Sequence, residues 1–339
     1  MSHSQKIRIA VNGPGRIGRA IIRAIFEEKM QNDFEIVAIN GSAPIETISH
    51  LLRYDSVHGT FNHKIEIIDH NLHIDGKKIL LTAERDPLKI DWKSHKIDIV
   101  FECTGAFTKY EDAYKHITAG AKKVIISAPA KEDNVKTIVY GVNHKNLTEN
   151  DAVISIGSCT TNCLAPIAKV LHDNIGIEKG FMTTVHAYTN DQNIVDNTHK
   201  DLRRARACAM SMIPTSTGAA KAIGLVLPEL KGKLDGGAIR VPTPNVSLVD
   251  LNFIASKNTS IEEINSLMKK YANGEMNRVL NYVSEPLVSI DFNHNNFSSN
   301  YDATQTKVIG GNMVKVCSWY DNEWAFSVRM LDVAKYLKI

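Results

Sequence analysis

The stretch IRIAVNGPGRIGR, residues 7–19, decides the fold because a short apolar run leads directly into a GxGxxG pattern. A helical pattern follows over about 17–30. In this context Gly13 permits a tight turn, Gly15 lets the backbone approach a pyrophosphate, and Gly18 lets the helix pack closely on the strand. The helix N-terminus offers N–H groups and a partial positive charge to phosphate. The stretch predicts a dinucleotide-binding turn, and an ordinary glycine-containing turn is the alternative.

Beyond this stretch, short apolar runs continue to alternate with helix-like segments as far as about Ser127. Strands are expected at 35–40, 97–105 and 123–129, with a further segment near 44–53 and a helix near 109–119. Because the runs show little alternation of apolar and polar residues, they are typical of strands covered on both faces. This part of the chain is therefore predicted to be α/β, with a Rossmann-type doubly wound parallel sheet.

The second half of the chain has longer strand-like runs separated by loops. After the run AVISIG at 152–157, a helix is expected to begin near Cys159. Strand-like runs follow at 180–189, 236–241, 246–255, 286–291 and 313–320. This pattern predicts an α+β domain with a mixed or antiparallel sheet and helices on one face. The expected domains are residues 1–158 and 159–321, and a C-terminal helix within 322–339 is expected to pack back on the first.

Composition excludes several classes of protein. A chain of 339 residues corresponds to about two domains. The net charge of +3 argues against a nucleic-acid-binding tail, and the 43% hydrophobic content argues against a disordered chain. No apolar run approaches the roughly 20 residues of a membrane span, and residues 1–5 are too polar to begin a signal peptide. We expect a soluble, cytoplasmic protein with neither nucleic acid nor membrane among its partners.

The cysteines point to one candidate nucleophile. Their number is odd and CxxC spacing is absent, so neither a disulfide framework nor a metal site is predicted. In SCTTNC, residues 158–163, Cys159 lies at an expected helix N-terminus, where the dipole lowers the thiol pKa. A small buried side chain is the alternative, and Cys163 is expected to pack in the core. His186, near the end of a strand-like run, is the candidate base, with a structural histidine as the alternative.

The second expected strand ends without the acidic residue that usually binds the adenine ribose. It ends at Asn40 and is followed by Gly41 and Ser42. A carboxylate at position 41 would repel a ribose 2′-phosphate, so its absence removes a barrier to NADP and makes Ser42 a candidate donor to that phosphate. In the alternative interpretation, Gly41 is a turn glycine and NAD binds through its other contacts.

Nine motifs together identify a family. In chain order they are GPGRIGR (13–19), YDSVHG (54–59), ECTG (102–105), SCTTNC (158–163), HAYTNDQ (186–192), DLRRARA (201–207), PTSTGAAKA (214–222), RVPTPNVS (240–247) and WYDNEW (319–324). Over essentially its entire length the chain resembles the phosphorylating glyceraldehyde-3-phosphate dehydrogenases. The second domain is then the catalytic domain, and the first binds the dinucleotide.

The resemblance implies a reaction and its catalytic residues. D-glyceraldehyde 3-phosphate, inorganic phosphate and NAD(P) would give 1,3-bisphosphoglycerate and NAD(P)H, with Cys159 as the nucleophile that carries a thioester and His186 as the base. Two alternatives are an erythrose-4-phosphate dehydrogenase and a nucleotide-sensing regulator that has lost activity. The family also implies a homotetramer, with the polar loop near 188–210 at a subunit contact.

The resemblance also implies binding residues. Thr189 and Arg240 would contact the substrate phosphate, and Arg204 would lie beside the phosphate subsites. The residues expected at the inorganic phosphate are Ser158, Thr160, Thr217 and Gly218. For the cofactor they are Arg16 and Ile17 at the pyrophosphate, Arg85 and Ser127 around the adenosine and nicotinamide parts, Asn322 at the carboxamide and Tyr320 beside the ring. Core packing is the alternative for Tyr320.

Three departures from the family pattern concern the cofactor. Pro14 stands in place of the usual Phe, Gly41 in place of the ribose-binding Asp, and Asn197 with Thr198 in place of the Leu-Pro of strictly NAD-dependent members. Pro14 is expected to fix the backbone without touching the phosphates. The other two departures favour use of NADP as well as, or instead of, NAD. On this interpretation Gly41→Asp should shift the preference toward NAD.

Overall fold

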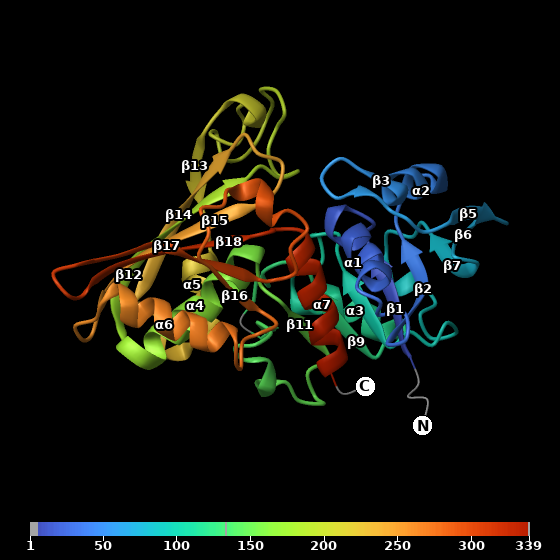
Figure 1. The fold of residues 1–339 in the computed structure, drawn as a ribbon. Coiled ribbons are helices and arrows are strands. Elements are labelled where there is room, and N and C mark those ends of the chain that lie inside the picture. The colour runs from blue at the N-terminus through green and yellow to red at the C-terminus, as the bar shows by residue number, and fades with distance from the viewer. Residues whose placement is uncertain (1–5, 133, 338–339) are drawn as a thin grey trace. The chain divides into compact units, whose positions relative to one another are not determined.

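The computed structural model describes residues 6–132 and 134–337, and the chain divides into two compact units (Figure 1). The first unit comprises the residues up to 138 together with 144–157 and those from 327 onward, and the second comprises 139–143 and 158–326. Residues 1–5, which were expected to be too polar for a signal peptide, are outside the described residues. So are residues 338 and 339 of the segment 322–339, within which a helix was expected. No helix within the described ranges is long and apolar enough to cross a membrane.

The first unit is built on a nine-stranded mixed sheet. In spatial order its strands are β10 (Lys136–Thr137), β11 (Val153–Ser155), β9 (Lys123–Ile126), β8 (Ile99–Glu102), β1 (Ile7–Asn12), β2 (Phe34–Asn40), β7 (Lys77–Thr82), β6 (Asn71–Ile74) and β5 (Ile65–Ile68). The strands from β10 to β7 pair in parallel, and β7, β6 and β5 pair antiparallel. The predicted Rossmann-type sheet is confirmed, and the antiparallel extension was not predicted.

Helices and a short ribbon complete the first unit. They are α1 (Arg16–Glu27), α2 (Ile45–Arg53), α3 (Tyr110–Thr118) and the two-stranded ribbon of β3 (Tyr54–Asp55) and β4 (Gly59–Thr60). Helix α7 (Trp324–Tyr336) begins in the second unit, and its residues from Ser327 onward belong to the first, where Lys335 forms an ion pair of 2.6 Å with Asp33.

The second unit holds a seven-stranded mixed sheet. In spatial order its strands are β13 (Ile213–Ser216), β14 (Leu234–Val241), β12 (Ile177–Ala187), β15 (Ser247–Ala255), β18 (Met313–Tyr320), β17 (Ser299–Ile309) and β16 (Leu280–Val283). Helices α4 (Cys159–Ile175), α5 (Ala219–Val226) and α6 (Ile261–Ala272) lie together against this sheet (Figure 1). Their apolar side chains form one buried core with the strands, as the predicted α+β domain requires.

One predicted strand is wrong. Residues 286–291 contain no strand, and Ser289–Phe292 form a short 3-10 helix instead. The Asp291 carboxylate accepts a hydrogen bond of 2.8 Å from Val288 N, which closes a turn, and Val288 and Ile290 are exposed. These two apolar side chains therefore lie on the surface, and β17 is the longer strand that the sequence pattern did not reveal.

Two glycines allow α1 to begin directly above β1. Gly13 has a φ of +96°, and a Cβ there would lie 2.8 Å from Thr104 N. A Cβ on Gly18 would lie 2.2 Å from Gly13 O, whereas one on Gly15 would meet nothing within 4 Å among the described residues. The close approach of helix and strand therefore requires Gly13 and Gly18, and Gly15 faces open space.

Replacing Gly18 with Ala should destabilise the protein even though Ala is the better helix former. The new methyl group overlaps a backbone oxygen, and overpacking of this kind costs about 1–3 kcal/mol of unfolding free energy. Thermal unfolding of the ligand-free protein measures the effect. Gly15→Ala is the matched control and should leave the unfolding temperature nearly unchanged; equal losses in the two variants would contradict the proposed packing.

Candidate active site

Cys159 lies in the first turn of α4, half-buried. Ser158 caps the helix, because its Oγ accepts a hydrogen bond of 3.0 Å from Thr161 N. Burial raises the pKa of the Cys159 thiol above its usual value, although Arg240 and hydrogen bonds from Thr160 act in the opposite direction. The sequence predicted a lowered pKa from the helix dipole; the pKa is raised instead because desolvation by burial outweighs the charge of Arg240 and the hydrogen bonds that favour the thiolate. The resting thiol therefore needs a base.

His186, near the end of β12, is placed to act as that base. Its Nε2 lies 3.5 Å from Cys159 Sγ, and its ring is 5% exposed. The ring packs edge-on against Tyr320, with centroids 5.9 Å apart. The Tyr320 hydroxyl in turn contacts the Thr160 and Thr184 hydroxyls, each at 2.8 Å. Tyr320 thus ties α4, β12 and β18 together and is 1% exposed, which favours the alternative of core packing over a place beside the nicotinamide ring.

Two groups compete for Nδ1 of His186. It lies 2.7 Å from the carbonyl oxygen of Ala187 and 2.9 Å from Nη1 of Arg240. The carbonyl requires a protonated Nδ1 and leaves Nε2 free to accept a proton, whereas the guanidinium requires an unprotonated Nδ1. Burial and then the charge of Arg240 lower the pKa of His186 to about 3. The imidazole is therefore neutral near pH 7, and the tautomer that donates to Ala187 can take the thiol proton.

Donors without partners mark a place for an anion. The Nε of Arg240 and Nε2 of Gln192 are both buried and have no hydrogen-bond partner among the described residues. The Oε1 of Gln192 accepts from Thr189 N at 3.3 Å, which orients the amide beside the end of β12. Buried unpaired donors are costly, so they favour a bound anion. Gln192 lies in the HAYTNDQ motif, but its spare donor is visible only in the structure.

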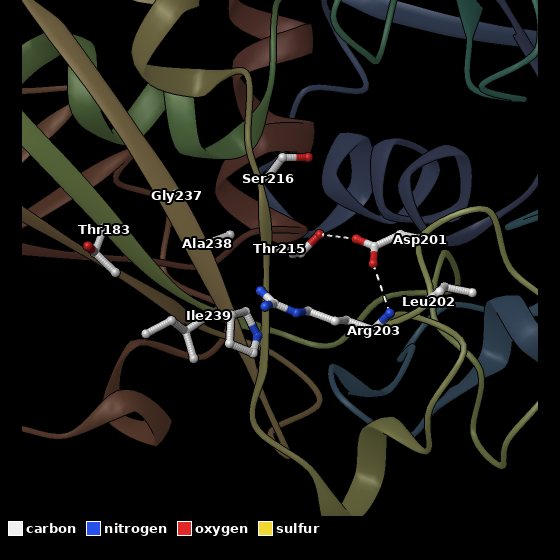
Figure 2. A pocket seen from close by; sticks show the side chains of 10 residues that line it. Thr183, Asp201, Leu202, Arg203, Thr215, Ser216, Gly237, Ala238 and Ile239 are labelled. Carbon is white, nitrogen blue, oxygen red and sulfur yellow. Dashed lines mark hydrogen bonds between the residues drawn. The ribbon is translucent and has the colours of Figure 1, made fainter.

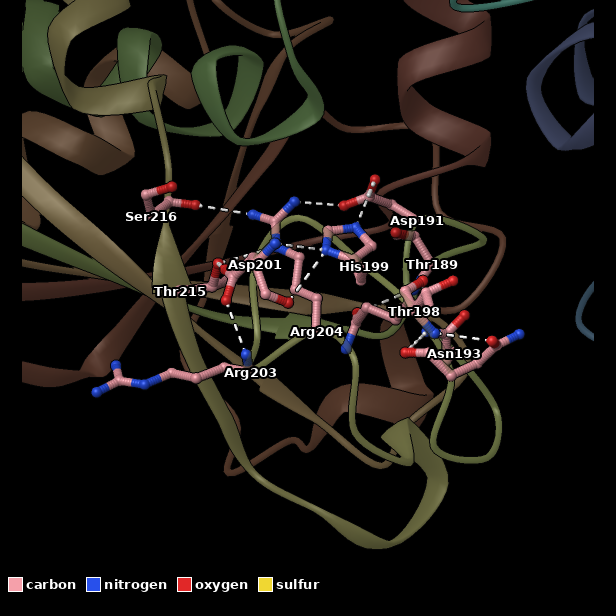
Figure 3. Close-up of polar contacts among 12 residues, drawn as sticks. Thr189, Asp191, Asn193, Thr198, His199, Asp201, Arg203, Arg204, Thr215 and Ser216 are labelled. Carbon is pink, nitrogen blue, oxygen red and sulfur yellow. Dashed lines mark hydrogen bonds and ion pairs between the residues drawn. The ribbon is translucent and has the colours of Figure 1, made fainter.

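Arg204 is already engaged by the protein (Figure 3). Its guanidinium forms an ion pair with Asp191, approaches Asp201 at 3.5 Å, and donates to Thr215 Oγ1 at 2.9 Å and to Ser216 O at 3.1 Å. Arg204 was expected beside the phosphate subsites as a cation that could bind phosphate. In this structure two carboxylates, those of Asp191 and Asp201, already neutralise its charge.

The other expected phosphate-binding residues lie at two helix N-termini. Ser158 caps α4, and the Thr160 hydroxyl is buried against Tyr320. Thr217 Oγ1 accepts from Ala219 N at 3.2 Å, and exposed Gly218 precedes α5. No hydrogen bond among the described residues links Thr217 or Gly218 to His186 or Cys159.

Asn322 is connected to the catalytic strand. Its Oδ1 accepts a hydrogen bond of 3.0 Å from Ser247 Oγ, and that hydroxyl accepts one of 3.1 Å from Ala187 N. The side chain is 6% exposed. Ser247 therefore fixes the orientation of the Asn322 amide relative to the backbone next to His186.

A separate cavity of about 620 Å³ also lies in the second unit (Figure 2). Asp201, which lines it, accepts from Thr215 Oγ1 at 2.6 Å and from Arg203 N at 2.9 Å. Neither Cys159 nor His186 lines this cavity, so its size does not identify it as the site of the thiol chemistry.

The first unit holds a cavity of about 490 Å³ at the carboxyl ends of β1 and β2. Its lining residues are Asn12, Gly13, Pro14, Gly15, Asn40, Gly41, Ser42, Ala43, Ala83, Glu84, Arg85, Cys103, Thr104, Ala106 and Phe107. No side chain in the described ranges caps the N-terminus of α1, so its N–H groups are available to a phosphate. With the open space at Gly15, these features fit a dinucleotide.

Two of the expected cofactor residues are engaged elsewhere. The Arg16 guanidinium binds Asp55 through both oxygens, at 2.6 and 3.2 Å. Burial raises the pKa of Asp55, but hydrogen bonds from His58, Arg16 and Val57 outweigh it and lower the pKa to about 2. Ser127 does not line the cavity, and its N–H, which donates to Glu102 O at 3.0 Å, continues the pairing of β9 with β8. Arg16 and Ile17 can therefore serve a phosphate through the helix N-terminus rather than through the guanidinium.

Comparison with known proteins gives consistent matches along the chain. Residues 7–110 match the family model "Glyceraldehyde 3-phosphate dehydrogenase, NAD binding domain", and residues 158–322 match that of the C-terminal domain. The chain is 56% identical over 328 residues to the glyceraldehyde-3-phosphate dehydrogenase of Xanthobacter flavus, which covers 97% of both chains. It is 55% identical over 332 residues to that of Geobacillus stearothermophilus, with 98% of both covered.

Replacing Arg240 with Gln should raise the pKa of His186. The variant removes a positive charge 2.9 Å from Nδ1, so the protonated imidazole is less disfavoured, while burial still holds the pKa below its usual value. An NMR titration of the labelled imidazole measures the change. Arg206→Gln, which alters an exposed arginine paired with Asp196, is the control and should leave the titration unchanged. An unaltered titration in Arg240→Gln would mean that burial alone sets the pKa.

Proposed function

The chain belongs to the glyceraldehyde 3-phosphate dehydrogenase family, and on that premise we propose that it oxidises D-glyceraldehyde 3-phosphate, with inorganic phosphate and NAD or NADP, to 1,3-bisphosphoglycerate. The observation that carries the proposal is Cys159 Sγ at the N-terminus of α4, 3.5 Å from a neutral His186. No relative named above favours an erythrose-4-phosphate dehydrogenase or a regulator. Cofactor binding is assigned to the first unit and catalysis to the second.

The reaction begins with proton transfer from thiol to imidazole. His186 holds Nδ1–H toward Ala187 O and accepts the Cys159 proton at Nε2. The thiolate then attacks the aldehyde carbon and forms a hemithioacetal. The protonated imidazole and the N–H of Cys159 are the donors available to the developing oxyanion. A neutral resting imidazole suits this step because it can accept the proton and then donate a hydrogen bond.

Oxidation and phosphorolysis follow on the same sulfur. When bound, the nicotinamide of NAD or NADP supplies the hydride acceptor. The imidazolium of His186 first gives its proton to the oxyanion, which becomes the hydroxyl of the hemithioacetal. The neutral imidazole then takes that hydroxyl proton back during the oxidation, and Cys159 carries a thioester. Inorganic phosphate attacks the thioester carbon, the C–S bond breaks, and the thiolate leaves with the electron pair as the acyl phosphate forms. A thiolate suits both steps because it is a strong nucleophile and a good leaving group.

Arg240 and Thr189 are proposed to bind the substrate phosphate. The buried Nε of Arg240 has no partner among the described residues, and an anion would satisfy it. Binding of that anion would also draw the guanidinium away from Nδ1 of His186 and favour the tautomer that accepts the thiol proton. Ser158, Thr160, Thr217 and Gly218 are proposed for inorganic phosphate, with Arg204 alongside once its pairing with Asp191 loosens.

The cofactor proposal includes NADP. Gly41, Ser42 and Arg85 line the first-unit cavity, and no carboxylate stands at position 41. Arg85 is exposed and has no ion-pair partner among the described residues, so a cation and a hydroxyl face the same cavity without an opposing charge at position 41. Asn197 and Thr198 are exposed and polar, in agreement with the same preference. Asn322 is proposed to bind the nicotinamide carboxamide.

A homotetramer in the cytoplasm is also proposed. Several large apolar side chains between 188 and 212 are highly exposed; they are Ile194, Val195, Leu202, Met210 and Met212, with exposed fractions of 71–82%. Exposure of this kind in one segment favours a contact between copies of the chain.

Replacing Cys159 with Ser should reduce phosphate-dependent turnover by at least about a thousandfold, because the hydroxyl is a far weaker nucleophile and leaving group. The measurement is the initial rate of reduced dinucleotide formation, with and without inorganic phosphate. Cys163→Ala is the control, since its thiol is fully buried in the core and should not take part. Retained turnover in the Cys159 variant would overturn the assignment.

The protein should turn over with NADP as well as with NAD. The expected result is a kcat/KM with NADP well above background, because no carboxylate at position 41 opposes the 2′-phosphate. Initial rates with each dinucleotide, at saturating aldehyde and phosphate, decide the point. Activity with NADP at the background level would restrict the proposal to NAD.

A further inference from the structure

Pro14 and Gly41 lie against each other in the first-unit cavity. A Cβ on residue 41 would lie 2.4 Å from Pro14 Cδ and 2.6 Å from Pro14 Cγ, and the next nearest atom is Pro14 N at 3.8 Å. Carbon atoms in contact are normally about 3.5–4.0 Å apart. Within the described residues, the pyrrolidine ring alone therefore blocks a side chain at position 41.

The backbone of Gly41 does not itself require glycine. Its φ is outside the left-handed region, and its N–H donates a hydrogen bond of 2.9 Å to Thr82 O, continuing the pairing of β2 with β7. Any L-residue can adopt this conformation. A left-handed backbone is therefore not the reason for glycine at this position, and the steric reason is Pro14.

The proline ring has little freedom to move away. Its φ is fixed by the ring, and it follows Gly13, which is packed against Thr104. The carbonyl of Pro14 accepts a hydrogen bond of 2.8 Å from Arg19 Nη1, on the first turns of α1. A side chain at position 41 would therefore have to displace the glycine-rich turn or distort the end of β2.

We propose that Pro14 is a cofactor-specificity residue, which excludes a carboxylate from position 41 and so keeps the ribose end of the dinucleotide site open to a 2′-phosphate. The inference rests on the proposed binding of NAD or NADP in this cavity. Pro14 and Gly41 then form one steric unit. Gly41→Asp by itself does not install a usable carboxylate, contrary to the expectation from the sequence alone.

A double-mutant cycle tests the coupling. The variants are Pro14→Ala, Gly41→Asp and the combination of both, because alanine lacks the Cγ and Cδ atoms that block position 41. The measurements are the unfolding temperature of the ligand-free protein and the equilibrium Kd of NAD and of NADP. Gly41→Asp alone should lower the unfolding temperature and bind NAD no more tightly than wild type. The double variant should recover stability and change the Kd ratio toward NAD by at least about tenfold, as a charged hydrogen-bond acceptor does.

A second pair separates size from charge. Gly41→Ala adds only the Cβ and no charge. As a single variant it should lower the unfolding temperature, and combination with Pro14→Ala should restore it. The proposal is overturned if Gly41→Asp alone remains stable and shifts the Kd ratio as far as the double variant does, or if Pro14→Ala rescues neither variant.

The same experiment distinguishes failure of this inference from failure of the proposed function. If the wild-type protein binds neither dinucleotide, the proposed function fails, and with it the specificity role. The unfolding temperatures of the alanine pair would still show whether the steric unit exists. If it binds NAD but not NADP, the site is not open to a 2′-phosphate, so the specificity role of Pro14 is overturned while the proposed oxidation with NAD stands.

Discussion

The buried carboxylate of Glu102 holds the carboxyl ends of β1 and β8 in place. It accepts hydrogen bonds from Asn12 Nδ2 at 2.5 Å, Thr104 N at 2.8 Å and His116 Nε2 at 3.1 Å. A buried carboxylate is costly unless its oxygens are satisfied, so loss of any donor would disturb the others. Asn12 also accepts from Asn40 at 2.6 Å, which extends the network to β2. Since Gly13 packs on Thr104, the network places the dinucleotide-binding turn.

In the second unit, strand register and the start of α4 bring Cys159, His186 and Arg240 together. Parallel pairing of β12 with β14 sets His186 opposite Arg240, and the start of α4 sets Cys159 within reach of the imidazole. Burial and, after it, the charge of Arg240 lower the pKa of His186 and keep its imidazole neutral. If Arg240 binds the substrate phosphate as proposed, one arginine would contact both the substrate and Nδ1 of the base.

The sequence predicted features that depend on local pattern. The strand at 7–12 and the helix beginning at Cys159 were predicted where β1 and α4 lie, because apolar runs and capping residues are local signals. The expected strand at 286–291 failed because the segment forms a turn closed by Asp291, with Val288 and Ile290 exposed. The pairing of Arg204 with Asp191 and the contact of Pro14 with Gly41 join residues distant in sequence, and no periodic pattern reveals them.

The two arginines implied for phosphate differ in their readiness for an anion. Arg204 has a carboxylate at its guanidinium and hydrogen bonds from its other nitrogens, so an anion there must compete with Asp191 for the same charge. Arg240 has a buried Nε without a partner among the described residues, so an anion there removes an existing cost. Binding at Arg240 is therefore favoured in the resting protein, and binding beside Arg204 requires a rearrangement first. On the proposed assignment of these two arginines, the substrate phosphate would therefore bind before the attacking ion.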